Sequence, residues 1–249
     1  MKGIDLQPLV FERAVREIEE YWARGGDSFH PYEKTFAIAG TEHDQLVPEG
    51  IENPYWELIR RIPSLRDVTW RGVTPYGHTI GLDVGRTMLV GTYAWSIPSP
   101  GDIAWVAGLL DGRKLVEVGA GSGYWAWQLS QAGVDVVAYE PNPATENSFV
   151  AVLEPYAPLL RGDASAAARH PDRALFLSWP NYSEPWGAHA LASYAGDLLF
   201  YVGEGEGGCC ADDSFFELLN AEWSEIGDSP HHRTWWGIND RLTAYRRAR

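Results

Sequence analysis

One stretch of the sequence limits the fold more than any other: an apolar strand that runs into a glycine-rich turn and then a helix. The strand is Leu115-Val116-Glu117-Val118, the turn runs from Gly119 to Gly123, and Tyr124-Trp125 begins the helix. Glycines permit positive φ angles and a close approach of the backbone to a ligand. The first N–H groups of a helix have no partner within the helix, so they can bind that ligand.

A second apolar strand follows, over residues 134–139, and it ends on Glu140. An acid at the tip of this strand can accept hydrogen bonds from the hydroxyls of a ribose. The two features together predict a cofactor that contains a nucleoside. The alternative is a tight strand–helix turn without a ligand, which leaves Glu117 and Glu140 unexplained.

The spacing of the glycines separates two kinds of nucleoside site. Dinucleotide-binding folds carry G-x-G-x-x-G, whereas this chain has glycines at 119, 121 and 123 and an acid two positions earlier. This E-x-G-x-G-x-G pattern resembles motif I of the class I S-adenosylmethionine-dependent methyltransferases. The resemblance implies an α/β fold: a Rossmann-like, seven-stranded, mostly parallel sheet with helices on both faces. It covers residues 101–249, and we expect residues 1–100 to form an N-terminal cap and connector.

The resemblance also implies which residues hold the cofactor. The turn would hold its methionine part, with the acid of motif I acting on the ammonium group. Glu140 would bind the ribose, and Asp163 with the backbone of Ala164 would bind the adenine. The alternative for Asp163 is the N-cap of a helix over 164–170. The full expected set is Glu117, Gly119, Ala120, Gly121, Gly123, Tyr124, Glu140, Pro141, Asp163, Ala164, Ser178, Trp179, Tyr93 and Trp95.

The segment Ser178-Trp179-Pro180-Asn181-Tyr182 departs from the N/D-P-P-Y tetrad of amino-group methyltransferases. Its position after the fourth strand indicates a pocket wall near the departing methyl group. The departure argues against methylation of amines and of DNA bases. No suitable Asp pair follows this strand, so a metal-dependent catechol-type site is not supported. Four short segments resemble those of a bacterial group within this family, and this resemblance implies no substrate. They are Trp95-Ser96-Ile97-Pro98, Gly123-Tyr124-Trp125, Trp179-Pro180 and Tyr201-Val202-Gly203-Glu204.

Methyl transfer from a sulfonium is an in-line displacement, for which holding the reactants in alignment supplies much of the catalysis. A general base is needed only if the nucleophile arrives protonated. The candidate catalytic residues are His189, Tyr182 and Trp179. A lone His at the position of His189 is more often a helix-surface residue than a base. The other candidate bases, His30, His78, His231 and His232, have no diagnostic context.

Two further segments are candidates for the pocket. Tyr32, Tyr93 and Trp95 come from the cap and connector, where they either contact ligand or form the core of the cap. The loop Glu204–Gly208 either acts as a lid or substrate contact, or is a solvated acidic loop.

The composition limits the partners. The chain has 249 residues, with 20 Lys and Arg against 34 Asp and Glu, a net charge of −14. Nucleic-acid binding rests largely on neutralising phosphates, so we expect neither nucleic acid nor a membrane as a partner. The one basic run, 241–249, is short enough to be a solvated terminal strand. Charges interrupt residues 11–20, so we expect no signal segment there.

The two adjacent cysteines, Cys209 and Cys210, are expected to be free thiols, which fits a cytoplasmic protein. No metal-type spacing of Cys and His is present. Aromatic residues make up 13% of the chain, 12 of them Trp, and such residues also build pockets for flat or cationic ligands.

Hydrophobic periodicity predicts the elements of the chain. The expected strands are 114–118, 134–140, 158–161, 174–179, 197–203 and 241–247, with one more at 224–227 or 233–237. The expected helices are 8–23, 54–61, 102–110, 123–132, 145–154, 164–170, 186–195 and 213–223. We expect residues 68–93 to be irregular or strand-like.

The sequence therefore predicts a cytoplasmic methyltransferase that uses S-adenosylmethionine, forms S-adenosylhomocysteine and needs no metal. The expected acceptor is a small molecule, aromatic or from specialised metabolism, and the expected assembly is a monomer or homodimer. Three alternatives stay open: an NAD-dependent oxidoreductase, a non-catalytic partner subunit that binds S-adenosylmethionine, and a protein methyltransferase.

Overall fold

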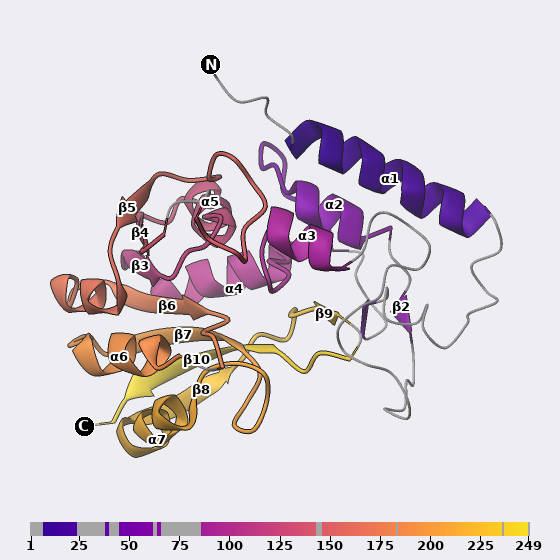
Figure 1. Cartoon of the computed structure of the whole chain (residues 1–249). Helices are drawn as coiled ribbons and strands as arrows, with labels where there is room; N and C mark the ends of the chain where they lie inside the picture. Colours follow the sequence, from indigo (N-terminus) through magenta and orange to yellow (C-terminus); the bar gives the residue numbers. More distant parts are fainter. Residues whose placement is uncertain are drawn as a thin grey trace.

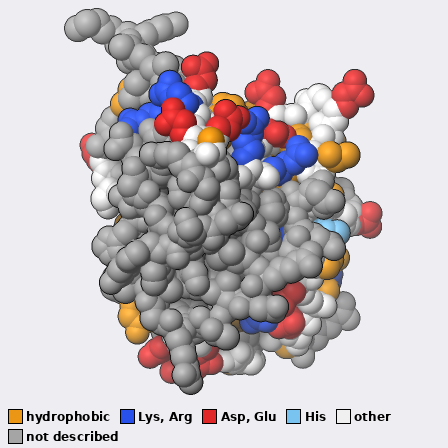
Figure 2. Space-filling view, turned by 90° about the vertical axis from the view of Figure 1, so that its right-hand side faces the viewer, with side chains coloured by type: hydrophobic (Ala, Val, Ile, Leu, Met, Phe, Trp, Pro, Cys, Tyr) orange, Lys and Arg blue, Asp and Glu red, His pale blue; other side chains and the backbone are white. Residues whose placement is uncertain are grey.

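The computed structural model describes residues 7–23, 38–39, 45–61, 64–65, 86–142, 146–182, 184–235 and 237–248. A large sheet with its helices occupies the left of Figure 1, and the N-terminal helices and a small second sheet lie together at the right. In the described ranges, no helix is both long and apolar enough to cross a membrane. Figure 2 shows acidic and basic side chains interspersed along the upper edge of the face that it draws.

The large sheet has seven strands in the order β5-β4-β3-β6-β7-β10-β8. Neighbours from β5 to β7 pair in parallel, whereas β10 is antiparallel to both β7 and β8. The strands are β3 Leu115–Val118, β4 Val136–Glu140, β5 Leu159–Arg161, β6 Ala174–Ser178, β7 Leu198–Gly203, β8 Trp223–Asp228 and β10 Arg241–Arg247.

This order confirms the expected Rossmann-like sheet of seven, mostly parallel strands. The dinucleotide-binding fold places its sixth strand directly beside the fifth. Here the antiparallel β10 is inserted between β7 and β8, so the two folds diverge beyond β7.

Side chains of the central strands alternate between two hydrophobic layers, as in strands buried on both faces. On one face Leu175 and Leu199 cluster with residues of η2, α6 and α7, and on the other Phe176 and Phe200 cluster with residues of α4 and α5. The helices are α4 Pro100–Leu110, α5 Tyr124–Gln131, η2 Ala164–Arg169, α6 Trp186–Ser193 and α7 Asp213–Glu222. Each of these elements was expected, with bounds that differ by about two residues or fewer.

The expected helix over 145–154 is wrong. In the part that the structure describes, residues 146–154 form turns and extended chain. The side chain of Asn147 accepts a hydrogen bond from the backbone N–H of Phe149 at 2.9 Å, and Ala151 donates to the carbonyl of Gly91 at 2.7 Å. An Asn side chain that bonds the backbone two residues on offers an alternative to helical hydrogen bonds.

The irregular or strand-like segment expected over 68–93 is wrong in its last part, because α3 Arg86–Thr92 is a helix. Residues 66–85 lie outside the described residues. Both places proposed for a further strand are strands, but only β8 joins the large sheet. The second, β9 Thr234–Trp235, pairs with β1 Ile38–Ala39, which in turn pairs with β2 Ser64–Leu65.

The basic C-terminal run is not a solvated terminal strand. As β10 it lies between β7 and β8, and Leu242 and Ala244 are fully buried. Its arginines form ion pairs with acids of neighbouring segments, Arg241 with Asp228, Arg246 with Asp197 and Arg247 with Glu222.

The N-terminal helices, α1 Gln7–Ala23 and α2 Pro54–Ile59, share a hydrophobic cluster with later parts of the chain. Tyr55 lies in this cluster beside Tyr124 of α5, and its hydroxyl accepts a hydrogen bond from Trp235 Nε1 at 3.1 Å. The side chain of Asn53 caps α2 and accepts a hydrogen bond from the hydroxyl of Tyr124 at 2.8 Å. The N-terminal part is thus fastened to α5, directly behind the glycine turn, while the boundary at residue 100 stays a prediction.

Candidate active site

The glycine turn joins β3 to α5 with three left-handed residues. Gly119, Gly121 and Gly123 have φ angles of 74°, 57° and 75°, in the region that favours glycine. Two of them are also confined by neighbours: a Cβ at Gly119 would lie 2.5 Å from the ring of Trp186, and one at Gly123 would lie 3.2 Å from the backbone nitrogen of Ala157. The predicted turn is therefore present, and its backbone requires glycine.

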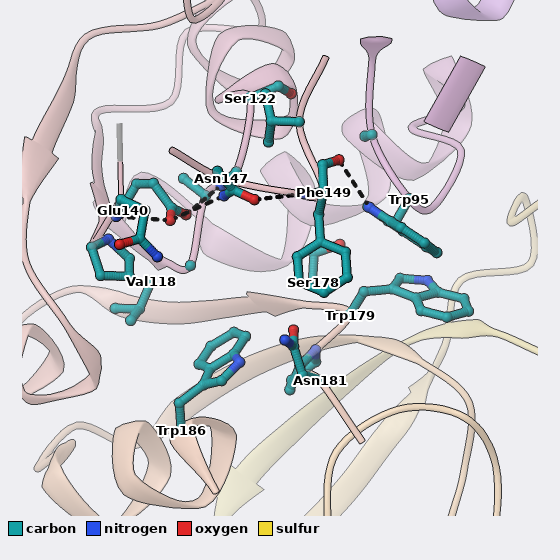
Figure 3. A pocket seen from close by; sticks show the side chains of 18 of the residues that line it. Trp95, Val118, Ser122, Glu140, Asn147, Phe149, Ser178, Trp179, Asn181 and Trp186 are labelled. Carbon is teal, nitrogen blue, oxygen red and sulfur yellow. Dashed lines mark hydrogen bonds between the residues drawn. The ribbon is translucent and has the colours of Figure 1, made fainter. Parts of the chain in front are cut away.

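Glu140 at the end of β4 is held against this turn (Figure 3). Its carboxylate accepts hydrogen bonds from the backbone N–H of Gly121 at 2.8 Å, from that of Asn142 at 3.2 Å, and from the amide of Asn147 at 3.2 Å. Burial raises the pKa of Glu140, and the three hydrogen bonds oppose that rise. The contacts fix the orientation of the carboxylate before any ligand binds.

Glu117 in β3 is the most unusual acid of the site. Its side chain is 1% exposed, and its Oε2 atom has no hydrogen-bond partner among the described residues. Burial raises the pKa of this carboxyl group to about 8, with a smaller contribution from the nearby charge of Glu140. A hydrogen bond with the backbone of Ala126 opposes this rise, but a buried carboxylate oxygen without a partner is still costly. This position therefore favours a ligand that brings a positive charge.

Asp163 caps η2, as the alternative interpretation expected. Its Oδ1 atom accepts from the backbone N–H of Ser165 at 2.9 Å and from the Ser165 hydroxyl at 2.6 Å. These hydrogen bonds lower the pKa of the exposed Asp163. Capping and ligand contact are compatible, because Asp163 and Ala164 also line the cavity described next.

A cavity of about 900 Å³ connects these groups, a volume near the upper end of the roughly 300–1,000 Å³ of ligand pockets. It is lined by every residue predicted for the site except Gly123, whose part is to shape the turn and begin α5. The predicted residues in its wall are Glu117, Gly119, Ala120, Gly121, Tyr124, Glu140, Pro141, Asp163, Ala164, Ser178, Trp179, Tyr182, His189, Tyr93 and Trp95.

Tyr93 and Tyr124 line the cavity and also belong to the hydrophobic cluster of the N-terminal helices. Tyr124 is fully buried, donates to Asn53 and accepts from the backbone N–H of Tyr55 at 3.0 Å. Tyr93 stacks on Tyr55 at 4.9 Å between ring centroids, and its carbonyl accepts from the hydroxyl of Ser122. The cap-core alternative therefore describes the Tyr93 ring, and the Tyr124 ring packs in the same core, although both residues border the cavity.

Trp95, Phe149 and Trp179 form an aromatic wall at the end of the cavity away from Glu140 (Figure 3). The ring centroids of Trp95 and Trp179 are 5.8 Å apart with planes at 39°, and Phe149 meets Trp95 edge-on at 5.8 Å. Ser178, before Trp179, shares a hydrogen bond of 3.1 Å with Ser96. We call the three rings the aromatic wall below.

The candidate bases fall in different places. His189 on α6 is exposed and lines the cavity, as does Tyr182, which is 62% exposed. Their catalytic roles stay predictions. His30, His78 and Tyr32 lie outside the described residues.

His232 is buried between two acids and does not border the cavity. Its Nδ1 lies 2.9 Å from Asp102 Oδ2, and its Nε2 lies 3.6 Å from Asp240 Oδ1. Burial lowers the pKa of His232, but the two carboxylates outweigh burial and raise it to about 10. Asp240 also accepts from Trp179 Nε1 at 3.2 Å, so this buried cluster supports the aromatic wall.

The loop that begins at Glu204 is not a solvated acidic loop at its start. Glu204 is 6% exposed, and its carboxylate accepts from the backbone N–H groups of Cys209 at 2.6 Å and Asn239 at 2.8 Å. The Glu204 carboxylate therefore stabilises the loop that Glu204 begins. Both cysteines are free thiols, with Cys210 buried and Cys209 exposed at the cavity.

Several wall residues were not predicted from the sequence. Asn147 and Phe149 lie in the segment that was expected to be a helix, and Trp186 and Arg86 carry no local motif. Asn181 had a signal, its place after the fourth strand, and Figure 3 shows its amide pointing into the cavity. Among the described residues no group of three or more His, Cys, Asp or Glu could hold a metal ion.

Comparison with known proteins gives only distant similarity. No protein-family model and no curated protein matches the chain. Among solved structures it is similar to the glycopeptide N-methyltransferase MtfA complexed with S-adenosyl-L-homocysteine, with 14% identity over 59% of this chain and 89% of that one and a TM-score of 0.42.

Two further structures show the same level of similarity. Magnesium protoporphyrin IX methyltransferase from Synechocystis with bound S-adenosylmethionine has 14% identity, 59% and 76% coverage, and a TM-score of 0.38. A protein of Thermoplasma acidophilum has 13% identity, 63% and 90% coverage, and a TM-score of 0.41. At these scores the likeness carries no weight for function, which has to be inferred from the site itself.

Proposed function

We propose that this protein transfers a methyl group from S-adenosylmethionine to a small-molecule acceptor. The observation that carries the proposal is the buried Glu117 carboxyl group, whose Oε2 atom has no partner among the described residues and which lines the same cavity as Glu140. An ammonium group would remove the cost of that burial through a charge-assisted hydrogen bond. S-adenosylmethionine brings an ammonium group for Glu117 and a ribose for Glu140.

The glycine turn supports the same cofactor. A Cβ at Gly121 would meet only Val150, at 3.7 Å, so the space in front of the turn is open to a ligand that any side chain there would displace. Both hydrogen bonds between Asp163 and Ser165 use Oδ1. In this proposal the Oδ2 atom of Asp163 accepts a hydrogen bond from the adenine amino group.

When bound, the cofactor supplies an electrophilic methyl group: an acceptor atom bonds to the methyl carbon, the carbon–sulfur bond breaks, and its electron pair returns to sulfur. The chain contributes mainly by holding the partners in line. The acceptor's proton, where it has one, passes to water or to a base, for which His189 is the candidate in the cavity wall. Trp179 and Tyr182 shape the acceptor side.

Calorimetric titration with S-adenosylmethionine, S-adenosylhomocysteine and NAD tests the proposal. We expect both sulfur compounds to bind and Glu140→Gln to weaken them, because the ribose loses a charged acceptor. Glu225→Gln, at an exposed carboxyl group of β8, is the matched control. Absence of binding by either sulfur compound at high protein concentration refutes the proposal, and binding of NAD alone favours an oxidoreductase.

Incubation with labelled S-adenosylmethionine and a metabolite extract then tests transfer. We expect label in a small molecule. Cofactor binding with no labelled product in any extract favours the non-catalytic partner subunit. Label in protein, when a cell lysate replaces the metabolite extract, favours a protein methyltransferase.

A further inference from the structure

The aromatic wall lies where an acceptor has to lie, provided that the proposed function holds. Trp179 follows the last residue of β6, and ligands of open parallel sheets bind beyond the carboxyl ends of the strands. Figure 3 shows Glu140 at one end of the cavity and the wall at the other, with Asn181 between the wall and Trp186. The cofactor groups and the wall thus occupy opposite ends of one cavity.

The spacing of the rings determines how a ligand can meet the wall. A flat ring inserted between two others needs about 7 Å between their planes, two contacts of roughly 3.5 Å each. The centroids of Trp95 and Trp179 are only 5.8 Å apart and their planes are tilted by 39°. A ligand therefore lies across the open side of the wall, against its faces and edges, and does not slot between the two indoles.

The wall is held in place without a ligand. The indole of Trp179 donates to Asp240, and its backbone N–H donates to the carbonyl of Val202 at 2.8 Å. Trp179 has a φ angle of 52°, an uncommon conformation for a bulky residue. Trp95 Nε1 donates to the carbonyl of Phe149 at 3.4 Å. A fixed wall loses little conformational entropy when a ligand binds.

The charge beside the wall distinguishes two kinds of ligand. Aromatic walls bind either flat rings or cations. The guanidinium carbon of Arg86, a residue that is 6% exposed, already lies 5.8 Å from the centroid of the Trp95 ring. The cation position on Trp95 is thus already occupied by Arg86, so a flat ring is the ligand that the rest of the wall suits best.

The geometry points to a planar ring compound as the methyl acceptor, stacked on the aromatic wall formed by Trp95, Phe149 and Trp179. The amide of Asn181 is the polar group that faces a substituent of that ring. That the ring compound is a methyl acceptor rests on the proposed function. Binding of a ring at this wall can be measured separately.

Matched probes test the site in the presence of S-adenosylhomocysteine. We expect 2-naphthol to bind at least about tenfold more tightly than its saturated counterpart decahydro-2-naphthol, and choline not to bind, as measured by calorimetry or ligand-observed NMR. Trp179→Ala and Phe149→Ala should each reduce 2-naphthol affinity by about three- to tenfold, while Trp179→Phe should retain most of it. Ile226→Ala, at an exposed residue of β8, is the control.

Equal binding of the two naphthols, no binding of 2-naphthol at millimolar concentration, or tighter binding of choline overturns the inference. Phe149 is 48% exposed, so its replacement keeps the test valid if Trp179→Ala does not fold. Titration of S-adenosylhomocysteine alone separates the two proposals. If it binds and 2-naphthol does not, only the ring site fails, and if the reverse holds, only the proposed function fails.

Discussion

Replacing Glu117 with Gln gives the sharpest test of the cofactor site, because the change removes a proton-binding group and keeps the shape. The free protein holds this carboxyl group largely protonated at neutral pH, since burial raises its pKa to about 8. A cofactor ammonium group would favour the carboxylate instead. We therefore expect binding of S-adenosylmethionine to expel a proton from Glu117.

The number of protons follows from the pKa. At pH 6.5 a group with a pKa of about 8 is almost fully protonated, and an α-amino group with a pKa of roughly 7.7–8.0 already carries its own proton. Binding should release about 0.9 proton from the wild-type protein and about none from Glu117→Gln. Affinity changes little at this pH, because the roughly 2 kcal/mol needed to deprotonate Glu117 offsets most of the ~1.5–3 kcal/mol from a charged hydrogen bond.

Without a ligand, wild type and Glu117→Gln should differ in how their free energy of unfolding depends on pH. Since the folded pKa of Glu117 is raised, the folded protein keeps a proton that the unfolded chain releases between pH 4.5 and about 8. Its contribution to the free energy of unfolding is fully present below pH 4.5 and falls as the pH rises through that window. Glu117→Gln does not titrate, so at pH 8 it should be more stable than the wild type by a few kcal/mol.

The proton count comes from calorimetry in buffers of different ionisation enthalpy, and the stability from urea unfolding at pH 5 and pH 8. Glu225→Gln controls for the loss of one exposed negative charge. A purely structural carboxyl group would show the stability difference but no proton release on cofactor binding. Equal proton release by wild type and Glu117→Gln, or a stability difference that does not grow from pH 5 to pH 8, refutes the reasoning.

Other positions test separate parts of the structure. His232→Gln leaves the buried carboxylates of Asp102 and Asp240 without their cation, and urea unfolding should show a loss of about 3–5 kcal/mol; an unchanged midpoint would mean that the cluster is not ionised. Gly121→Val places a side chain in the cavity at a φ of 57°, so calorimetry should show at least about tenfold weaker binding of S-adenosylhomocysteine. Asp163→Asn keeps the helix cap, and we expect an unchanged melting temperature with about tenfold weaker cofactor binding; unchanged binding would leave capping as its role.

The glycine turn and Glu140, at the proposed cofactor end of the cavity, could be predicted from the sequence because their geometry is local. The turn needs glycine at positive φ in three alternate positions, and Glu140 ends the next strand, so both features are visible in one short stretch. Parallel β3 and β4 then bring the two together, and the N–H of Gly121 bonds the Glu140 carboxylate.

The helix expected over 145–154 failed for a reason that the sequence only partly contains. Asn147 competes with helical hydrogen bonds through its own side chain, and the N–H of Ala151 bonds the carbonyl of Gly91, far away in the chain. The contact between Ala151 and Gly91 joins segments far apart in the chain, so the local sequence does not reveal it. The same contact lies beside the Phe149–Trp95 ring pair. The segment that departs from the predicted helix therefore contributes one ring of the aromatic wall.

The abundance of aromatic residues predicted a pocket but not its members, because core and wall use the same residue types. Burial and position separate them: Tyr55 is fully enclosed and does not line the cavity, whereas Trp95 and Trp179 are only partly buried and line it. The wall residues stand in connections between elements, where substitutions disturb the sheet least and where binding residues concentrate. Change of acceptor in related chains should therefore follow the positions of Trp95, Phe149 and Trp179, while the glycine turn and its two acids stay fixed with the donor.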